Sequence, residues 1–221
     1  MKNTIKYILL ACFMAISVVA GDSDTQDINI STDYKFKIGY SYYQCEDYKE
    51  AMKWYLFAAK KNHPRAQFYI GFMYDSGDGV KRDYQEAMKW YLLAAKQNHP
   101  GAQFYIGSMY DNGDGVEQDY QEAMKWYLLA AKQNHSRAQY DLGIMYYYGD
   151  GVEQDYKEAL KWYLLAAKQN HSKAQFYIGN IYRCGLGVEQ DLEQANRIYF
   201  IVFFIMFIIH KKLFIQLQAR Y

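Results

Sequence analysis

Apolar residues follow two helical patterns that alternate along most of the chain. In the first pattern, at residues 83–97, apolar side chains are spaced at i, i+3, i+4, i+7 and i+8, which places them on one face of an α-helix. They are Ala87, Trp90, Tyr91, Ala94 and Ala95. The second pattern, at residues 102–111, has the same spacing in Ala102, Tyr105, Ile106, Met109 and Tyr110. The sequence therefore predicts pairs of amphipathic helices in an all-α fold without strands.

The two patterns recur with a fixed period of 36 residues. Asp47, Asp83, Asp119, Asp155 and Asp191 mark the same place in successive copies. Trp54, Trp90, Trp126 and Trp162 mark a second equivalent place in the first four. A period of this size is typical of stacked repeats, in which each helix pair buries its apolar face against its neighbours. The predicted fold class is an α-solenoid, and the buried stripe of Trp and Tyr is expected to be core.

The polar residues at the ends of these patterns predict where each helix begins and ends. Asp83 is a good N-cap, and Glu86 three residues later completes the sequence of a capping box. Asn98 suits the left-handed conformation of a helix C-terminus, and Pro100 starts the next helix. Gly107 lies inside a helix, where glycine is unfavourable, so we expect two helices to approach too closely there for a Cβ.

These residues resemble the Sel-1-like repeat (SLR), a relative of the tetratricopeptide repeat. The matching string is A-Q-x-x-[I/L]-G-x-[M/I]-Y-x-x-G-x-G-V-x-x-D-x-x-x-A-x-x-W-Y-x-x-A-A, and the resemblance covers residues 33–199. It implies a right-handed superhelix of antiparallel helix pairs. Family members mostly act as adaptors for protein assembly, and several bacterial members are exported and meet host proteins.

The array is predicted to contain five repeats, at residues 32–63, 64–99, 100–135, 136–171 and 172–199, of which the last is partial. The first repeat lacks the GDGV insertion that the second, third and fourth repeats carry between their helices. Residues 1–20 are predicted to be a secretory signal, with Lys2 and Lys6 ahead of an apolar run and cleavage before Gly21. An uncleaved anchor is the alternative. Residues 21–31 are expected to be a flexible lead-in.

Composition and motifs exclude several kinds of chemistry. The formal net charge of +1 gives no indication of the basic surface that is typical of nucleic-acid binding. Cys45 and Cys184 lie near opposite ends of the array, so we expect two free thiols or an intermolecular bridge. No cofactor or metal site is predicted, and the histidines that recur once per copy are expected to serve helix turns: His63, His99, His135 and His171. One cysteine-rich subfamily of the resemblance has been linked to β-lactam hydrolysis, but this chain lacks its paired cysteines and any S-x-x-K motif. We therefore predict that the protein is not an enzyme.

The predicted function is that of an exported scaffold, periplasmic or secreted, which binds a protein or peptide in a concave groove. In the tetratricopeptide pattern the first helix of each pair lines this groove. Carried onto this chain, the groove residues are Phe36, Tyr40, Tyr43, Phe68, Phe72, Asp75, Phe104, Ser108, Asp111, Tyr140, Ile144, Tyr147, Tyr148, Phe176, Asn180 and Arg183. The alternatives are a membrane-tethered structural protein of the envelope and, less favoured, a β-lactamase-like hydrolase.

The C-terminal tail, residues 200–221, departs from the repeat. From Ile198 to Ile209 the side chains are apolar, which leaves no polar helix face. Twelve helical residues span about 18 Å, less than the ~30 Å hydrocarbon core of a membrane. Three structures fit this tail: a capping helix, a membrane or partner anchor, and a drifted end outside the array. We favour the anchor.

Overall fold

The computed structural model describes residues 31–200, and every regular element in this range is an α-helix. The all-α prediction is therefore confirmed for the described residues. The helices are α2 (Thr32–Gln44), α3 (Tyr48–Ala59), α4 (Pro64–Ser76), α5 (Tyr84–Ala95), α6 (Pro100–Asn112), α7 (Tyr120–Lys132), α8 (Ser136–Tyr148), α9 (Tyr156–Ala167) and α10 (Ser172–Cys184). Residues 192–200 are also helical. The predicted signal at residues 1–20, residues 21–30 of the lead-in and the tail from residue 201 lie outside the described residues.

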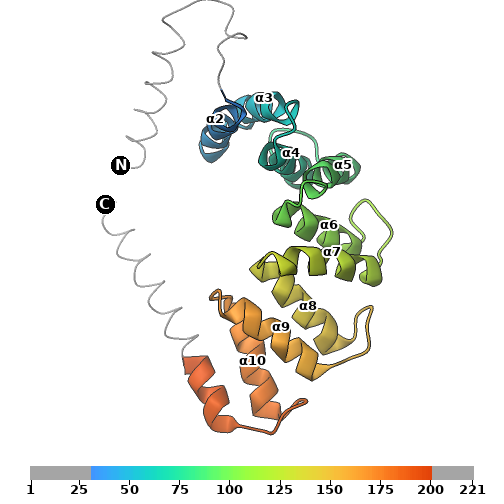
Figure 1. The fold of residues 1–221 in the computed structure, drawn as a ribbon, viewed down its shortest axis with the longest axis vertical. Coiled ribbons are helices and arrows are strands. Elements are labelled where there is room, and N and C mark those ends of the chain that lie inside the picture. Colours follow the sequence, from blue (N-terminus) through green and yellow to red (C-terminus); the bar gives the residue numbers. More distant parts are fainter. Residues whose placement is uncertain (1–30, 201–221) are drawn as a thin grey trace, which may run out of the picture. The chain divides into compact units, whose positions relative to one another are not determined.

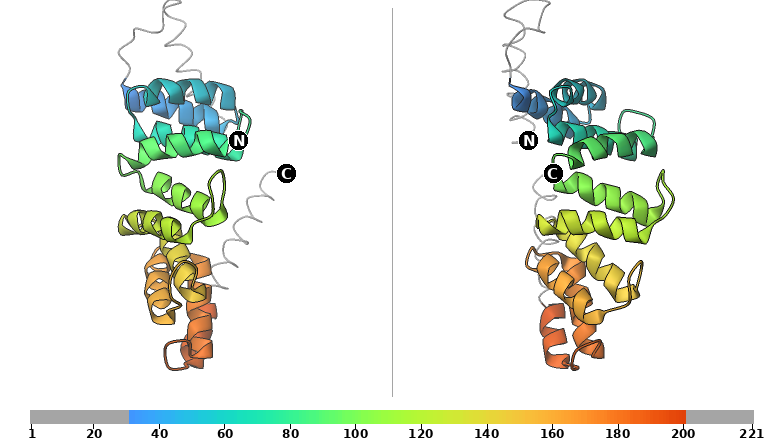
Figure 2. Two further views of the ribbon diagram at one scale, coloured as in Figure 1. Left: turned by 90° about the vertical axis from the view of Figure 1, so that its right-hand side faces the viewer. Right: turned by 45° about the vertical axis from the view of Figure 1, so that its right-hand side comes forward.

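The chain divides into two compact units, residues 1–94 and 95–221, which we call unit 1 and unit 2. Unit 1 contains α2 to α4 and nearly all of α5, whereas unit 2 contains α6 to α10 and the helical residues 192–200. Within each unit the helices follow one another as neighbours in chain order (Figure 1). In unit 2, the loops that follow α6 and α8 project on the same side (Figure 2).

The second helix of each copy begins at the aspartate that the sequence predicts as N-cap. The carboxylate of Asp119 accepts a hydrogen bond from the backbone N–H of Glu122 at 3.0 Å, and Asp83 does the same for Glu86. The second hydrogen bond of the predicted capping box, in which the glutamate carboxylate would accept the backbone N–H of the aspartate, is wrong. The Glu122 carboxylate instead accepts hydrogen bonds from Lys125 at 2.6 Å and from the indole N–H of Trp126 at 3.1 Å.

The helices α4, α6, α8 and α10 begin at the repeated histidine, which confirms its predicted role in helix turns, whereas α2 begins at Ser31. His135 caps α8, because its Nδ1 accepts the backbone N–H of Ala138 at 3.3 Å. Asn134, just before it, has a φ of 61°, so the left-handed asparagine is confirmed as well. The helices α4, α6, α8 and α10 then end at a left-handed glycine, such as Gly113 with a φ of 78°, whereas α2 ends at Cys45.

The core is built where the helical glycine of a first helix meets a tyrosine of the following helix. A Cβ added to Gly107 would lie 2.7 Å from the Cδ1 atom of Tyr127 and 3.2 Å from the carbonyl oxygen of Ala123. The close approach predicted from the repeated glycine is thus confirmed. The tyrosine, not the tryptophan before it, is the fully buried aromatic: Tyr127 is 1% exposed, whereas Trp126 is half-buried. The Trp and Tyr stripe predicted to be core is therefore fully buried at its tyrosine, while the tryptophans, such as Trp90 and Trp162, pack partly buried against the core.

Among residues 31–200, no helix has the length and apolar character needed to cross a membrane. Cys45 and Cys184 are both exposed, and neither forms a disulfide within the chain.

Candidate partner-binding surface

Three tyrosines of the second helices donate their hydroxyl groups to residues of the first helices that the sequence assigns to the groove. Tyr91 donates to the Asp75 carboxylate at 3.1 Å in unit 1. In unit 2, Tyr127 donates to Asp111 at 3.1 Å, and Tyr199 donates to the amide oxygen of Asn180 at 2.7 Å. Asp75, Asp111 and Asn180 therefore support the core, in addition to any contact that they make with a partner.

Two predicted groove residues, Phe36 and Phe104, are core residues, and their assignment to an open groove is wrong. They are 1% and 4% exposed. The ring of Phe104 stacks on His135 at 4.8 Å, and the Arg137 guanidinium covers it at 5.1 Å. The ring of Phe36 stacks on His63 at 4.9 Å and is covered by Arg65 at 4.5 Å. His63 and His135 therefore each cap a helix and also stack on a buried aromatic ring.

The other predicted residues of unit 1 form a continuous set of ring contacts. Tyr40 and Tyr43 both contact Tyr69, with ring centroids 5.6 Å and 5.8 Å apart, and Tyr43 also contacts Phe72 at 6.4 Å. The Tyr43 hydroxyl donates to Asp78 at 2.6 Å, which together with burial raises the pKa of Tyr43. Tyr43, Phe68 and Phe72 are half-buried, and Tyr40 is more exposed. These rings are therefore largely engaged in contacts with one another.

In unit 2, α8 and α10 contribute to a group of five tyrosines that also includes Tyr163 of α9: Tyr140, Tyr147, Tyr148, Tyr163 and Tyr177. We call this set the tyrosine cluster. The Tyr147 ring lies 4.9 Å from Tyr148 and 5.3 Å from Tyr177, and Tyr177 stacks on Tyr163 at 5.2 Å. The hydroxyl groups of Tyr148 and Tyr177 are 3.3 Å apart.

The most exposed aromatic side chains of α8 and α10 are Tyr148 and Phe176. Tyr148 is 56% exposed and Phe176 is 50% exposed, and Arg183 of α10 is exposed as well. By contrast, Tyr147 and Ile144 are half-buried and pack against the core of the α9 and α10 layer. Of the predicted groove residues in unit 2, Tyr148, Phe176 and Arg183 are therefore the ones that a partner can reach without disturbing the core.

Near Tyr127 the same face is polar. Asp111 and Ser108 are half-buried, and Ser108 accepts a hydrogen bond from the amide of Asn112 at 3.3 Å. Asp141 of α8 lies close enough to Asp111 for the two carboxylates to repel each other. Burial is the main cause that raises the pKa of Asp141 to about 7, and the negative charge of Asp111 adds to it. Arg137 and Lys173 lower this pKa, but their effect is weaker. Burial and the Asp150 charge also raise the pKa of Asp111.

The stability of the protein is expected to depend on pH through Asp141. In the unfolded chain an aspartate titrates near ~3.9. Between this pH and about 7, the native protein holds a proton that the unfolded chain has released, so stability falls as pH rises through this window. Asp141→Asn should remove this loss, so that the variant becomes progressively more stable than the wild type from pH 4 to 7. Urea unfolding at several pH values measures the difference.

His135 contributes with the opposite sign, so the wild-type curve alone is not diagnostic. Burial and Arg137 lower the pKa of His135 to about 4, against about 6.5 in the unfolded chain. Its neutral form therefore contributes stability that increases from pH 4 to 6.5. The comparison of wild type with Asp141→Asn cancels this contribution. Parallel curves for the two proteins would contradict the assignment to Asp141.

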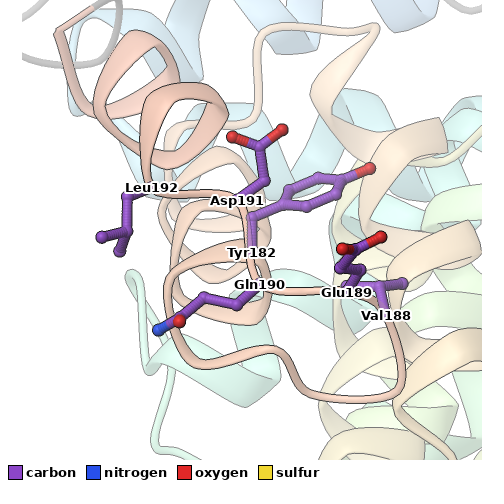
Figure 3. Close-up of a pocket in the computed structure, with 6 residues that line it drawn as sticks. All are labelled: Tyr182, Val188, Glu189, Gln190, Asp191 and Leu192. Atoms are coloured by element: carbon purple, nitrogen blue, oxygen red, sulfur yellow. The ribbon is translucent and has the colours of Figure 1, made fainter.

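A hollow lies beside the last loop of unit 2 (Figure 3). It is lined by Tyr182, Val188, Glu189, Gln190, Asp191 and Leu192. The side chains diverge, since Leu192 and Gln190 point away from the Tyr182 ring. The Asp191 carboxylate has a structural role, because it accepts the backbone N–H of Gln194 at 2.8 Å and caps the last helix. Within residues 31–200, no three or more His, Cys, Asp or Glu side chains are grouped so as to hold a metal ion.

The structure adds polar residues that the sequence pattern did not single out. Asp141 is one of them, and the buried glutamines Gln103 and Gln139 are others, at 3% and 2% exposed. The side-chain oxygens of Gln103 and Gln139 accept hydrogen bonds from Gln133 at 2.7 Å and Gln169 at 2.8 Å. The recurrence of Ala-Gln in the four later copies was the available signal for a buried amide.

The comparisons with known proteins agree with this architecture. A family model described as the Sel1 repeat matches residues 36–63, 64–99, 100–135, 136–171 and 172–199. The structure is similar to a protective antigen of uropathogenic Escherichia coli with an SLR fold (37% identity, TM-score 0.72), over 76% of this chain and 37% of that chain. It is also similar to a Sel1 repeat protein from Oxalobacter formigenes (37% identity, TM-score 0.71), over 76% of this chain and 69% of that chain.

This chain thus covers little more than a third of the length of the Escherichia coli antigen. A sel1 repeat protein from Klebsiella pneumoniae shares the fold at 16% identity and a TM-score of 0.55, over 85% of this chain and 93% of that chain. No curated protein matches the chain.

Proposed function

Because the chain belongs to the Sel1 repeat family, whose repeats commonly serve as protein-interaction scaffolds, we propose that it binds a protein or peptide partner through α8 and α10. The observation that carries this proposal is the exposure of Tyr148 and Phe176, two aromatic side chains held on a rigid helical layer. Large aromatic side chains and arginine are enriched among the residues that dominate interface energies. Arg183 on the same two helices fits this composition.

Comparison of equivalent positions in the copies favours a role of these residues in binding. The core tyrosines, glycines and histidine caps recur in copy after copy, whereas the exposed positions of the first helices differ: Asn112 of α6 corresponds to Tyr148 of α8 and Cys184 of α10. Stacking fixes the core positions and leaves the exposed ones free to suit a partner. A partner that covers Tyr148 and Phe176 would bury apolar surface that now faces water.

A double variant, Tyr148→Ala with Phe176→Ala, should weaken partner binding by about tenfold or more, since each anchor is worth over ~1 kcal/mol. The partner is first captured on the immobilised protein and purified, and its Kd is then measured with each variant. Both side chains are at least half exposed, so the far-ultraviolet circular dichroism and the melting temperature should change little.

The matched control is Leu129→Ala with Leu165→Ala, which removes two apolar side chains of similar exposure, 44% and 39%, from the second helices α7 and α9. We expect this control to retain its affinity. If the leucine variant loses affinity while the aromatic variant keeps it, the partner binds the second helices and the proposed surface is rejected.

The proposal includes export of the protein. The basic and then apolar composition of residues 1–20 supports it. We expect N-terminal sequencing of the folded protein to begin at or near Gly21. Sequencing the soluble and membrane fractions separately also tests the alternative, a membrane-tethered envelope protein, which the apolar run from Ile198 to Ile209 favours. Intact Met1 in both fractions would contradict export by cleavage.

A further inference from the structure

The layer of α8, α9 and α10 differs from the neighbouring layer of unit 2 in the hydrogen-bonding groups that it carries. Between α6 and α7, the core tyrosine Tyr127 donates to the Asp111 carboxylate. The position of Asp111 is occupied by Tyr147 in α8 and by Arg183 in α10. A carboxylate only accepts hydrogen bonds, whereas the side chains of tyrosine and arginine donate them. The first helices of this layer therefore replace an acceptor with donors.

The loop after α10 also lacks an acceptor that the other copies have, and this distinguishes unit 2 from unit 1. In unit 1 the hydroxyl of Tyr43, at the position of Tyr147, donates to Asp78 at 2.6 Å. Leu186 takes the place of Asp78 in the loop after α10, and it packs against the same core cluster as Tyr147. Tyr43 therefore uses its hydroxyl proton within the protein, while Leu186 offers no acceptor to Tyr147. The two units have similar rings but different hydrogen-bonding groups.

The rings that a partner can reach in this layer stand at large angles to their neighbours. The plane of Tyr148, which is 56% exposed, lies at 71° to that of Tyr147. The plane of Phe176, which is 50% exposed, lies at 89° to that of the half-buried Tyr177. The hydroxyl groups of Tyr148 and Tyr177 are 3.3 Å apart. Because one proton is enough for a hydrogen bond between two hydroxyl groups, the other proton can be donated to a bound partner.

Resting on the proposed function, we propose that the partner presents a proline-rich segment in the polyproline II conformation, which binds to Tyr148, Tyr177 and Phe176. A proline has a backbone carbonyl but no N–H, so such a segment brings acceptors and no donors. The tyrosine hydroxyls and the exposed Arg183 guanidinium are the complementary donors. Other extended peptides bring backbone N–H groups, which need acceptors such as the aspartates that this layer has replaced. Polyproline II is also formed before binding, and aromatic surfaces are its usual sites.

Fluorescence anisotropy of the full chain with labelled peptides tests this class of partner. The probes are decaproline, a decapeptide of alternating Gly and Ser, and an acidic decapeptide of alternating Glu and Gly. Decaproline should bind about tenfold tighter than the other two, because only decaproline combines apolar rings with backbone acceptors and no backbone N–H. Since its side chains carry no charge, its Kd should change by less than about twofold when salt is added.

Three variants separate the ring from the hydrogen-bond donors. Tyr148→Ala should weaken decaproline binding by about tenfold, whereas Tyr148→Phe, which keeps the ring, should weaken it by about threefold. Arg183→Asp replaces a donor with an acceptor and should weaken binding by about threefold as well. This variant is expected to fold, because Asp111 has the equivalent position in α6. The matched control is Tyr34→Ala, which removes a tyrosine of 47% exposure from α2 and should leave the Kd unchanged.

No detectable binding of decaproline, equal affinity for the Gly-Ser peptide, tighter binding of the acidic peptide, or an unchanged Kd in Tyr148→Ala would each overturn the proline-rich segment. These outcomes are distinct from failure of the proposed function, because the natural partner is tested separately by competition with decaproline. A natural partner that loses affinity with Tyr148→Ala and Phe176→Ala, but is not displaced by decaproline, would retain the binding surface and reject only the proline-rich segment.

Discussion

Tyr127→Ala should lower the free energy of unfolding by about 3–5 kcal/mol, as other removals of fully buried aromatic rings do. The ring is 1% exposed, packs against Gly107 and contacts Phe104, with ring centroids 5.7 Å apart. Alanine would leave a cavity between α6 and α7 and would remove the hydrogen-bond donor of Asp111. Urea unfolding followed by tryptophan fluorescence and by circular dichroism measures the loss.

Two further variants separate the contributions of this site. Trp126→Ala should cost clearly less, because the indole is half-buried. Tyr127→Phe should cost about 1–2 kcal/mol, since Asp111 loses its donor, whereas Tyr163→Phe should be close to neutral because its hydroxyl has no partner. A larger loss for Trp126→Ala than for Tyr127→Ala would contradict this account of the core.

Gly107→Ala should also destabilise the protein, by about 1–3 kcal/mol, although alanine is the better helix former by ~1 kcal/mol. Its Cβ would lie 2.7 Å and 2.8 Å from two ring carbons of Tyr127. Because the ring is buried and the Ala123 carbonyl lies 3.2 Å away on the other helix, α6 and α7 must separate to make room. Thermal and urea unfolding should both show the loss.

A double variant identifies the clash as the cause. Gly107→Ala combined with Tyr127→Leu removes the ring that the new methyl group would meet, so the loss in the double variant should be smaller than the sum of the two single losses. Strict additivity would mean that the glycine acts through the backbone alone and that the close contact with the ring is not the reason for its recurrence.

Much of the fold could be predicted from the sequence, because in stacked repeats the apolar residues at helical spacing form the buried face of each helix. The spacing of Ala87, Tyr91 and Ala94 places them on one helix face, and Asn98 and Pro100 mark a turn by backbone preference alone. The relative burial of a tryptophan and the tyrosine that follows it could not be predicted in this way. Both lie on the apolar stripe, and only the position of the facing glycine decides which ring is enclosed.

The binding surface was harder to predict, because equivalent positions in different copies have different neighbours. Phe104 and Phe176 occupy the same position, yet Phe104 is 4% exposed under Arg137 and His135, while Phe176 is 50% exposed. Alignment of the copies shows that Tyr43 and Tyr147 replace the aspartate of Asp75 and Asp111, but it does not show that the hydroxyl groups of Tyr55 and Tyr163 are buried without a partner. That information requires the paired helices in three dimensions.

Several contacts that support the core have a genetic consequence, because both residues of each contact belong to the same copy. Residues 100–135 contain both members of the pairs Gly107 and Tyr127, Asp111 and Tyr127, and Gln103 and Gln133. Unequal recombination between such similar copies would insert or delete 36 residues at a time, the period of the repeat, and each resulting copy would keep a complete set of partners. The number of copies can therefore change by recombination without separating the two residues of these pairs.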